Sequence, residues 1–288
     1  MHLSTSQLEA FHTAAKLESF TKAASRLHLT QSALSQRIRK LEDGLETCLF
    51  VRAPGGIRLT EAGQRLLQYC RDRETLDTGL AGDLGGAAEG GLSGALRIAG
   101  YSSVMRSAVV PALGPLLRGN PGVHCEFFVR EMGELPGMLK RAEAEFVVVD
   151  RALDWRDVIT HTLGREEYVA IESATHRTRE DVYLDHDPED HATHWFFRDQ
   201  PDVPRYRRSY MGDVYGILDG VAHGLGRAVM SRHLIGTDSG VRILPQYEPC
   251  AVDVVLHRYT ECHASRLHAA ALEALQAGCP GYLGMTPD

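Results

Sequence analysis

A short segment near the N-terminus carries side chains suited to reading the edges of nucleic-acid bases. On a helix, Ser32, Ser35 and Gln36 would share one face, followed one turn later by Arg39. Glutamine can bond to adenine, serine can donate or accept, and arginine neutralises phosphates. The opposite face is an apolar stripe spaced i, i+4, i+7, i+11: Leu34, Ile38, Leu41 and Leu45. The pattern favours a helix inserted into a major groove; a solvated helix face is the alternative.

Two shorter helices are expected before this segment. Ser6 and Glu9 have capping-box spacing and predict the start of a first helix. A second helix is expected over Lys22–Leu27 with Thr21 as its N-cap, and Thr30 is the expected cap of the third, which runs to about Leu45. Two helices joined by a tight turn make a helix-turn-helix, and this context favours the groove over the solvated face.

An arginine-bearing hairpin follows the third helix. Residues 50–60 form two extended pieces joined by Pro54, Gly55 and Gly56, with Arg52 on one side of the turn and Arg58 on the other. Such a wing can enter a minor groove or hold phosphates. The head is therefore predicted to be a winged helix-turn-helix. The residues expected to contact DNA are Thr30, Gln31, Ser32, Ser35, Gln36, Arg39, Arg52 and Arg58.

The head resembles LysR-type transcriptional regulators across about residues 3–65. The resemblance rests on FTKAASRL (20–27), TQSALSQRIRKLE (30–42), LFVR (49–52) and LTEAG (59–63). It implies base or backbone contacts from Gln31, Ser32, Ser35 and Gln36, and wing contacts from Arg52 and Arg58. Gln36 departs from the pattern, because many members carry a basic residue there. Residues 30–39 also resemble the branch that activates lysine and arginine export, which makes a basic amino acid a candidate effector.

A long helix should begin at Glu61, capped by Thr60. Its apolar positions are Ala62, Leu66, Tyr69, Leu76, Leu80 and Leu84. In the family this linker pairs antiparallel with a second copy, and an exposed stripe of this length also predicts a dimer. Glycines are dense from Gly79 to Gly94, so the helix is expected to end or fray between Gly79 and Gly91, unless a partner helix holds it straight.

The remaining chain alternates short apolar strands with helices. Strands are expected at 95–99, 123–129 and 146–149, with helices ending near 117 and over 134–143, which predicts a parallel sheet that binds ligands at its carboxyl edge. The resemblance implies a two-lobed α/β effector domain similar to periplasmic binding proteins, with a second lobe starting near Tyr168–Ile171, a return strand near Val254–Arg258 and a closing helix at Ser265–Gln276. The expected domains are 1–60 (DNA-binding), 61–91 (linker and glycine-rich joint) and 92–288 (effector-binding, lobe I about 92–163 and 263–288, lobe II about 164–262).

An effector site is expected between the lobes. Polar residues follow the first strand at a helix N-terminus, a place suited to an anion, and acids end the next two strands, where they could receive a cationic group. A small-molecule effector would suit this arrangement, with an amino acid as a candidate. Helix capping and a surface salt bridge are the respective alternatives. The expected residues are Tyr101, Ser102, Ser103, Glu131 and Asp150, faced by Phe197, Arg198 and Asp213.

Composition excludes several classes of protein. The 288 residues are 43% hydrophobic and 24% charged, as in an ordinary globular protein. No apolar run is long enough for a membrane span, and the N-terminus lacks a signal-peptide core, so a cytoplasmic protein is expected. The net charge is -7, yet residues 1–60 carry eight Lys or Arg against five acids. A basic head on an acidic body suggests that one end meets a polyanion.

The sequence contains no recognised catalytic or phosphate-binding motif, and no enzyme, cofactor or metal site is predicted. A ligand-rich cluster is interpreted as a polar loop: His186, Asp187, Asp190, His191 and His194. Six cysteines occur without a C-x-x-C pair. The prediction is a ligand-responsive regulator that binds double-stranded DNA as a homodimer or homotetramer, with RNA polymerase as a further candidate partner. The alternatives are a metal- or redox-sensing regulator on the same scaffold, and a solute-binding or enzymatic body whose head does not bind DNA.

Overall fold

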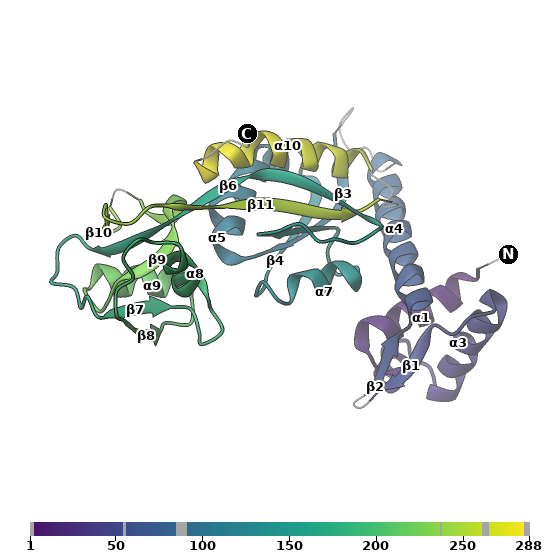
Figure 1. Ribbon diagram of the computed structural model, residues 1–288. Coiled ribbons are helices and arrows are strands. Elements are labelled where there is room, and N and C mark those ends of the chain that lie inside the picture. Colours follow the sequence, from purple (N-terminus) through teal and green to yellow (C-terminus); the bar gives the residue numbers. More distant parts are fainter. Residues whose placement is uncertain (1–2, 54–55, 85–90, 237, 261–264, 285–288) are drawn as a thin grey trace.

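The computed structural model describes residues 3–53, 56–84, 91–236, 238–260 and 265–284. Figure 1 shows a small N-terminal head joined by one long helix to an elongated α/β body. The head contains α1 (Thr5–Leu17), α2 (Phe20–Arg26), α3 (Gln31–Leu45), β1 (Phe50–Ala53) and β2 (Gly56–Leu59), and the connecting helix is α4 (Glu61–Leu84). Among the described residues, no helix combines the length and the apolar character needed to cross a membrane.

The head is the expected three helices and hairpin, but two predicted caps were wrong. The first helix is capped by Ser4, whose N–H donates to Gln7 Oε1 at 3.3 Å, rather than by Ser6. The second is capped by Ser19 instead of Thr21, since the Ser19 hydroxyl accepts from the Lys22 N–H. Burial of the apolar side chains decides between neighbouring polar residues that are equally able to cap.

The linker helix continues through Gly79 and Gly82 to Leu84. The fraying predicted between Gly79 and Gly91 falls in part on residues 85–90, which lie outside the described residues, as do the side chains of Leu80 and Leu84. Leu66 is buried against the head, whereas Tyr69 and Leu76 are 47% and 50% exposed.

The body is built on one seven-stranded sheet and a small two-stranded one. The first part contains β3 (Ser93–Gly100), α5 (Ser102–Val104), a π-helical turn η1 (Met105–Val109), α6 (Val110–Gly119), β4 (Gly122–Val129), α7 (Leu135–Lys140) and β5 (Phe146–Val149). Then come β6 (Val158–Ser173), β7 (Val182–Asp185), α8 (Ala192–Arg198), β8 (Arg207–Tyr210), α9 (Val214–Ala222), β9 (Ala228–Ser231), the 3-10 turn η2 (Arg232–Leu234), β10 (Val241–Ile243), β11 (Cys250–Tyr259) and α10 (Arg266–Leu283).

The strand order is β10-β6-β11-β5-β3-β4, with β9 also on β6. β3 is parallel to both β4 and β5, as predicted. Successive residues of β3 point to opposite faces of the sheet. Ile98 packs in the core under α6 and α10, whereas Ala99 packs in the core with α7. In Figure 1, α10 lies on one side of these strands and α7 on the other.

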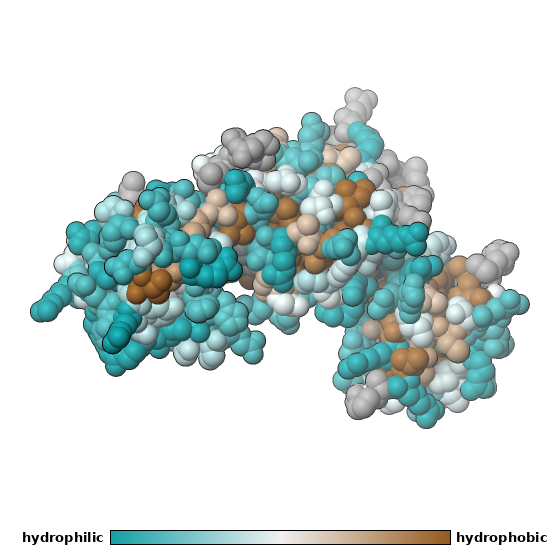
Figure 2. All heavy atoms as spheres, viewed as in Figure 1, coloured by the Kyte–Doolittle hydropathy of each residue, from teal (hydrophilic) through white to brown (hydrophobic). Residues whose placement is uncertain are grey.

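Two long antiparallel strands join this first lobe to the second. β6 and β11 pair from Val158 opposite Tyr259 to Tyr168 opposite Cys250, with a bulge at Val254/Val255. β6 (Val158–Ser173) runs without interruption through the expected start of the second lobe near Tyr168–Ile171, so one strand belongs to both lobes. Figure 2 shows a mainly hydrophilic surface over the β7–β10 end, while hydrophobic residues gather over the central strands.

Candidate DNA-reading face and effector cavity

The α3 helix exposes the predicted reading face. Thr30 caps it by accepting the Ala33 N–H at 3.1 Å, which fixes where the helix begins. The inner stripe is buried, with Leu34 fully enclosed and Ile38 and Leu41 each 2% exposed. On the outer face, Ser35 is half-buried and the others are exposed: Gln31, Ser32, Gln36 and Arg39.

The wing is fixed to the end of α3 by one carboxylate. Glu42 Oε1 accepts the backbone N–H groups of Leu49 at 2.7 Å and Phe50 at 3.3 Å. The Phe50 ring lies 5.3 Å from the rings of both Phe11 and Phe20, so the first wing strand is anchored in the head core. Arg52 and Arg58 are exposed on the paired wing strands, and the turn residues Pro54 and Gly55 lie outside the described residues.

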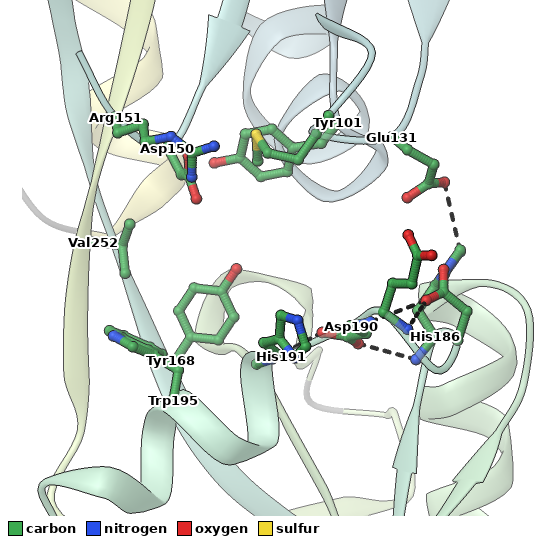
Figure 3. Close-up of a pocket in the computed structure, with 15 residues that line it drawn as sticks. Tyr101, Glu131, Asp150, Arg151, Tyr168, His186, Asp190, His191, Trp195 and Val252 are labelled. Carbon is green, nitrogen blue, oxygen red and sulfur yellow. Dashed lines mark hydrogen bonds and ion pairs between the residues drawn. The ribbon is translucent and has the colours of Figure 1, made fainter. Parts of the chain in front are cut away.

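A cavity of about 710 Å³ opens between the two lobes. The first lobe supplies residues at the carboxyl ends of its parallel strands, the position where open α/β sheets bind ligands. The second lobe supplies the loop after β7 and the start of α8, and the long strands supply Tyr168 and Val252 (Figure 3). The lining residues are Tyr101, Glu131, Met132, Gly133, Asp150, Arg151, Tyr168, His186, Asp187, Glu189, Asp190, His191, Ala192, Trp195 and Val252.

Three of the eight predicted effector residues line this cavity. Tyr101 follows β3, Glu131 follows β4 and Asp150 follows β5, so the sheet brings them to one edge. Ser102 and Ser103 do not line it. Ser102 begins α5, and the Ser103 carbonyl accepts the Ser107 hydroxyl at 2.6 Å.

The three residues predicted from the second lobe lie elsewhere. Phe197 is 1% exposed and packs edge-on to Tyr183 and Phe196 in the core of that lobe. Arg198 is on the surface and pairs with Asp199 at 2.9 Å. Asp213 caps α9, accepting the N–H groups of Tyr215 and Gly216, both at 2.9 Å. Core packing and helix capping, rather than ligand contact, account for their positions.

The ligand-rich cluster instead forms much of the second-lobe wall. The loop after β7 carries His186, Asp187, Glu189, Asp190 and His191 into the cavity. The sequence indicated these residue types but not their neighbours. Their proximity to Glu131 follows from the meeting of two lobes that are distant in sequence.

A buried ion pair holds that loop in place. Asp185 is 1% exposed and accepts from the Arg208 guanidinium and from the Thr193 hydroxyl. The same guanidinium donates to the backbone carbonyls of Asp187 at 3.1 Å and Pro188 at 3.3 Å, and to that of Asp190. Burial raises the pKa of Asp185, while the hydrogen bonds from Thr193 and Arg208 oppose the rise. Arg208 thus fixes both the end of β7 and the loop beyond it.

Carboxylates dominate the electrostatics of the cavity. Five of them line it, against a single arginine, Arg151: Glu131, Asp150, Asp187, Glu189 and Asp190. Asp150 Oδ1 is buried and accepts no hydrogen bond from the described residues, and Arg151 NH1 lies 3.5 Å away from it. A buried acceptor without a donor is costly, so a ligand that brings a donor here is favoured.

One contact crosses the cavity mouth. His186 Nε2 lies 3.8 Å from Glu131 Oε1, and His186 Nδ1 lies 2.9 Å from Asp187 Oδ2. The hydrogen bond to Asp187 raises the pKa of His186, and the charge of Glu131 raises it further against the effect of burial. The ligand atoms of these three residues all lie within 4.8 Å of one another, a spacing that can hold a cation.

Aromatic rings complete the wall beside Asp150. Tyr168 and Trp195 pack edge to face, with centroids 5.7 Å apart. Burial, and then the neighbouring charge of Glu166, raises the pKa of both Tyr101 and Tyr168 well above the usual value. The cavity therefore combines negative charge with aromatic faces, which also attract cations.

Three of the described cysteines have features of inert thiols. Cys48, Cys70, Cys125, Cys250 and Cys279 are free. Burial raises the pKa of Cys70, Cys125 and Cys279 to about 12, which suppresses the reactive thiolate. Cys262 lies outside the described residues.

Comparison with known proteins matches both parts of the chain. Residues 5–64 match the family described as "Bacterial regulatory helix-turn-helix protein, lysR family", and residues 89–280 match "LysR substrate binding domain". The regulator DgdR of Burkholderia cepacia is 29% identical over 95% of this chain and 93% of its own length. The RuBisCO operon transcriptional regulator of Allochromatium vinosum is 44% identical, and ShiR of Corynebacterium glutamicum (strain R) is 30% identical. Those two alignments cover 25% and 59% of this chain and 24% and 58% of the relatives' lengths.

Solved structures show the same fold. Full-length LysG of Corynebacterium glutamicum with bound effector Arg is 21% identical, with a TM-score of 0.71 over 96% of this chain and 99% of that one. ArgP of Mycobacterium tuberculosis is 20% identical, with a TM-score of 0.75 over 96% and 97%.

Proposed function

The chain belongs to the LysR family of bacterial regulatory helix-turn-helix proteins, and we propose that it switches transcription in response to a small cationic molecule bound between its lobes. Residues 1–60 would bind DNA, 61–91 would pair two subunits, and 92–288 would bind the effector, with lobe I at about 92–163 and 263–288 and lobe II at about 164–262. A protein with this role works in the cytoplasm.

The head supports sequence-specific DNA binding. Its exposed α3 face presents amides and hydroxyls ahead of Arg39, and the wing presents Arg52 and Arg58 beside it. Exposed Tyr69 and Leu76 on α4 give the apolar stripe through which a second copy would pair. A dimer, or a dimer of dimers, would place recognition helices in successive major grooves of an imperfect palindrome and bring RNA polymerase within reach.

The excess of carboxylates around the cavity is the observation that supports a cationic effector. An ammonium or guanidinium group would satisfy Asp150 Oδ1, compensate the acidic loop and lie against Tyr168 and Trp195. A basic amino acid is the leading candidate, with Arg151 available for its carboxylate. The arginine bound to LysG, a protein of the same fold, agrees with this choice.

A divalent metal is the second candidate, favoured by the grouping of Glu131, His186 and Asp187. In this arrangement His186 would give Nε2 to the metal while Nδ1 stays bonded to Asp187. A metal here would join the two lobes directly.

Footprinting of the full-length protein on the DNA upstream of its own gene tests the proposal. L-Arginine, L-lysine, L-glutamate and zinc are each added, and thermal melting is followed in parallel. Protection of a spaced palindrome that changes with arginine or lysine is expected. A response to zinc alone, abolished by a chelator, would select the metal candidate. Diffuse, salt-sensitive binding would remove the regulator assignment and favour a body whose head does not read DNA.

Replacing Gln31 and Arg52 separates base reading from phosphate contact. Gln31→Ala should weaken operator binding by about 1–3 kcal/mol and leave binding to unrelated DNA unchanged. Arg52→Ala should weaken both equally and lower the salt slope by about one. Mobility shifts on operator and scrambled DNA at several salt concentrations measure both. Equal losses from the two variants on scrambled DNA would show that Gln31 does not read a base.

The pH dependence of effector binding should report His186. The hydrogen bond to Asp187 raises its pKa in the folded protein, so the imidazolium persists below the folded pKa and is lost as the pH rises through it. Because this charge repels a cation, the affinity for L-arginine should rise by several-fold between about pH 6 and about pH 8. Calorimetry measures the rise, and His186→Gln should flatten it. An unchanged profile in the variant would assign the titration to another group.

A further inference from the structure

Behind the cavity wall lies a fully enclosed carboxylate. Glu166 is on β6 with a side chain that is 0% exposed, and it does not line the cavity. One carboxylate oxygen is hydrogen-bonded to Tyr101 and Tyr168, and the other is hydrogen-bonded to Ser231 and His233. Burying a carboxylate is costly unless its oxygens are well satisfied, so this arrangement specifies the positions of its partners.

The first oxygen takes the hydrogens of both cavity tyrosines. Tyr101 Oη donates to Glu166 Oε1 at 2.9 Å, and Tyr168 Oη donates to the same atom at 3.2 Å. A hydroxyl has one hydrogen, so each tyrosine oxygen has only lone pairs left for the cavity. The raised pKa of both phenols keeps these hydrogens in place. In Figure 3, the two rings reach into the cavity from opposite sides.

The second oxygen is held by a chain of fixed donors. The Ser107 hydroxyl gives its hydrogen to the Ser103 carbonyl, so at 2.7 Å it accepts from His233, and Nδ1 of that ring carries a hydrogen. His233 Nε2 lies 2.8 Å from Glu166 Oε2, and Ser231 donates to the same oxygen at 2.7 Å. The hydrogen bond between histidine and glutamate occupies this oxygen. Oε2 is thereby committed, and only Oε1 faces the tyrosines.

We propose that Glu166 determines ligand selection without touching the ligand, by making Tyr101 and Tyr168 hydrogen-bond acceptors toward the cavity. Together with the five carboxylates, they leave a wall on which hydrogen-bond acceptors predominate. An ammonium or guanidinium group finds partners over most of this wall, whereas a carboxylate meets lone pairs except near Arg151. The inference rests on the proposed function in that it takes this cavity as the effector site.

Two substitutions at Glu166 distinguish orientation from charge. In Glu166→Gln the amide oxygen can still accept both tyrosine hydrogens, and the amide hydrogens can bond Ser231 and a neutral His233. In Glu166→Leu the acceptor is gone, and the tyrosine hydrogens turn toward the cavity. Calorimetry on the full-length protein uses L-arginine, 1,4-diaminobutane and succinate, a dicarboxylate of the same carbon number as the diamine.

Glu166→Leu is expected to weaken binding of the cations by about tenfold or more, because unpaired or opposed hydrogen-bonding groups are left at the ligand. Glu166→Gln should stay within about threefold of the wild type, since it conserves the acceptor. The matched control is Glu172→Gln, on the same strand and also buried, but bonded to Arg227 and Arg242 outside the network. Its affinities should equal those of the wild type. Equal losses from both Glu166 variants would overturn the inference.

A double-mutant cycle separates selection from a purely structural role. With both tyrosines changed to phenylalanine, Glu166→Leu should cause no further loss of affinity. If Glu166→Leu does not fold, Tyr101→Phe with Tyr168→Phe still decides, because wild-type affinity in that variant would overturn the proposal. The proposal would also be overturned if the wild-type protein bound succinate more tightly than the cations. A protein that protects an operator but binds neither cation would refute the effector class and this inference together. A protein that binds the cations but no operator would leave the selection result valid.

Discussion

Replacing Arg208 by alanine is expected to reduce the free energy of unfolding by about 3–5 kcal/mol and to abolish the response to effector. The substitution leaves Asp185, which is 1% exposed, without its cationic partner, and breaking a buried pair in this way is strongly destabilising. It also removes the donor shared by the carbonyls of Asp187, Pro188 and Asp190, so the acidic wall of the cavity loses its support. Operator binding without effector should persist, because the head has its own core.

The neighbouring arginine provides the matched control. Arg207 pairs with Asp181 on the surface, where ion pairs contribute little, so Arg207→Ala should melt like the wild type and bind effector normally. Arg208→Lys should keep part of the stability, because an ammonium can still pair with Asp185. It cannot reach three carbonyls at once, so effector affinity should fall further than stability. Chemical unfolding followed in the second lobe, together with calorimetry, measures both effects. Wild-type effector binding by Arg208→Ala would show that the loop is held by other contacts.

Local patterns were sufficient where local interactions decide the structure. The cap at Thr30 and the apolar stripe from Leu34 place α3. The phenylalanine and three valines at residues 146–149 contain enough β-branched apolar character to place β5. The parallel order of β3, β4 and β5 then brought Tyr101, Glu131 and Asp150 to one edge. Those three predictions depended only on the alternation of strands and helices in the first lobe.

The arrangement of the second lobe could not be predicted from local patterns in the same way. β6 carries polar residues along much of its length, among them Glu166, which resembles a solvent-facing residue until its partners are known. Tyr168 is its neighbour on β6, but the other three partners lie directly after β3 (Tyr101), on β9 (Ser231) and in η2 (His233), and no local pattern relates these three to Glu166. Phe197 and Arg198 are adjacent, yet one is core and the other surface, a distinction set by which side of α8 meets the strands.

For the acidic loop after β7, the sequence indicated the residue types but not their position in the cavity. Its residue types were evident, and the predicted polar loop is correct for His186, Asp187, Asp190 and His191, whereas His194 lies on α8. Its place at the cavity follows from the end of β7 lying opposite Glu131, a contact between lobes that only the tertiary fold creates. Residue chemistry was therefore visible in the sequence, whereas the identity of the facing group was not.

Gly63→Ala is expected to destabilise the head by about 3 kcal/mol and to weaken operator binding in proportion to the unfolded fraction. The first turn of α4 packs directly on the chain that leads into the wing. A methyl group at Gly63 would overlap the Leu49 carbonyl oxygen and lie 2.9 Å from Leu59 Cδ2. That carbonyl accepts the Thr60 N–H at 2.9 Å, while the Leu49 N–H is bonded to Glu42, so the backbone has no free direction in which to move.

A second glycine in the head makes the comparison specific. Gly44 lies near the end of α3, and a methyl group there meets nothing within 4 Å. Because alanine favours the helix over glycine, Gly44→Ala should stabilise the head by about 0.5 kcal/mol and leave operator affinity unchanged. Thermal melting of the full-length protein, followed by mobility shifts well below the melting temperature, tests both variants. A lower melting temperature for Gly63→Ala and a higher one for Gly44→Ala would show that the wing depends on the close packing of α4 at Gly63. Parallel shifts would mean that α4 and the wing are not held together at this point.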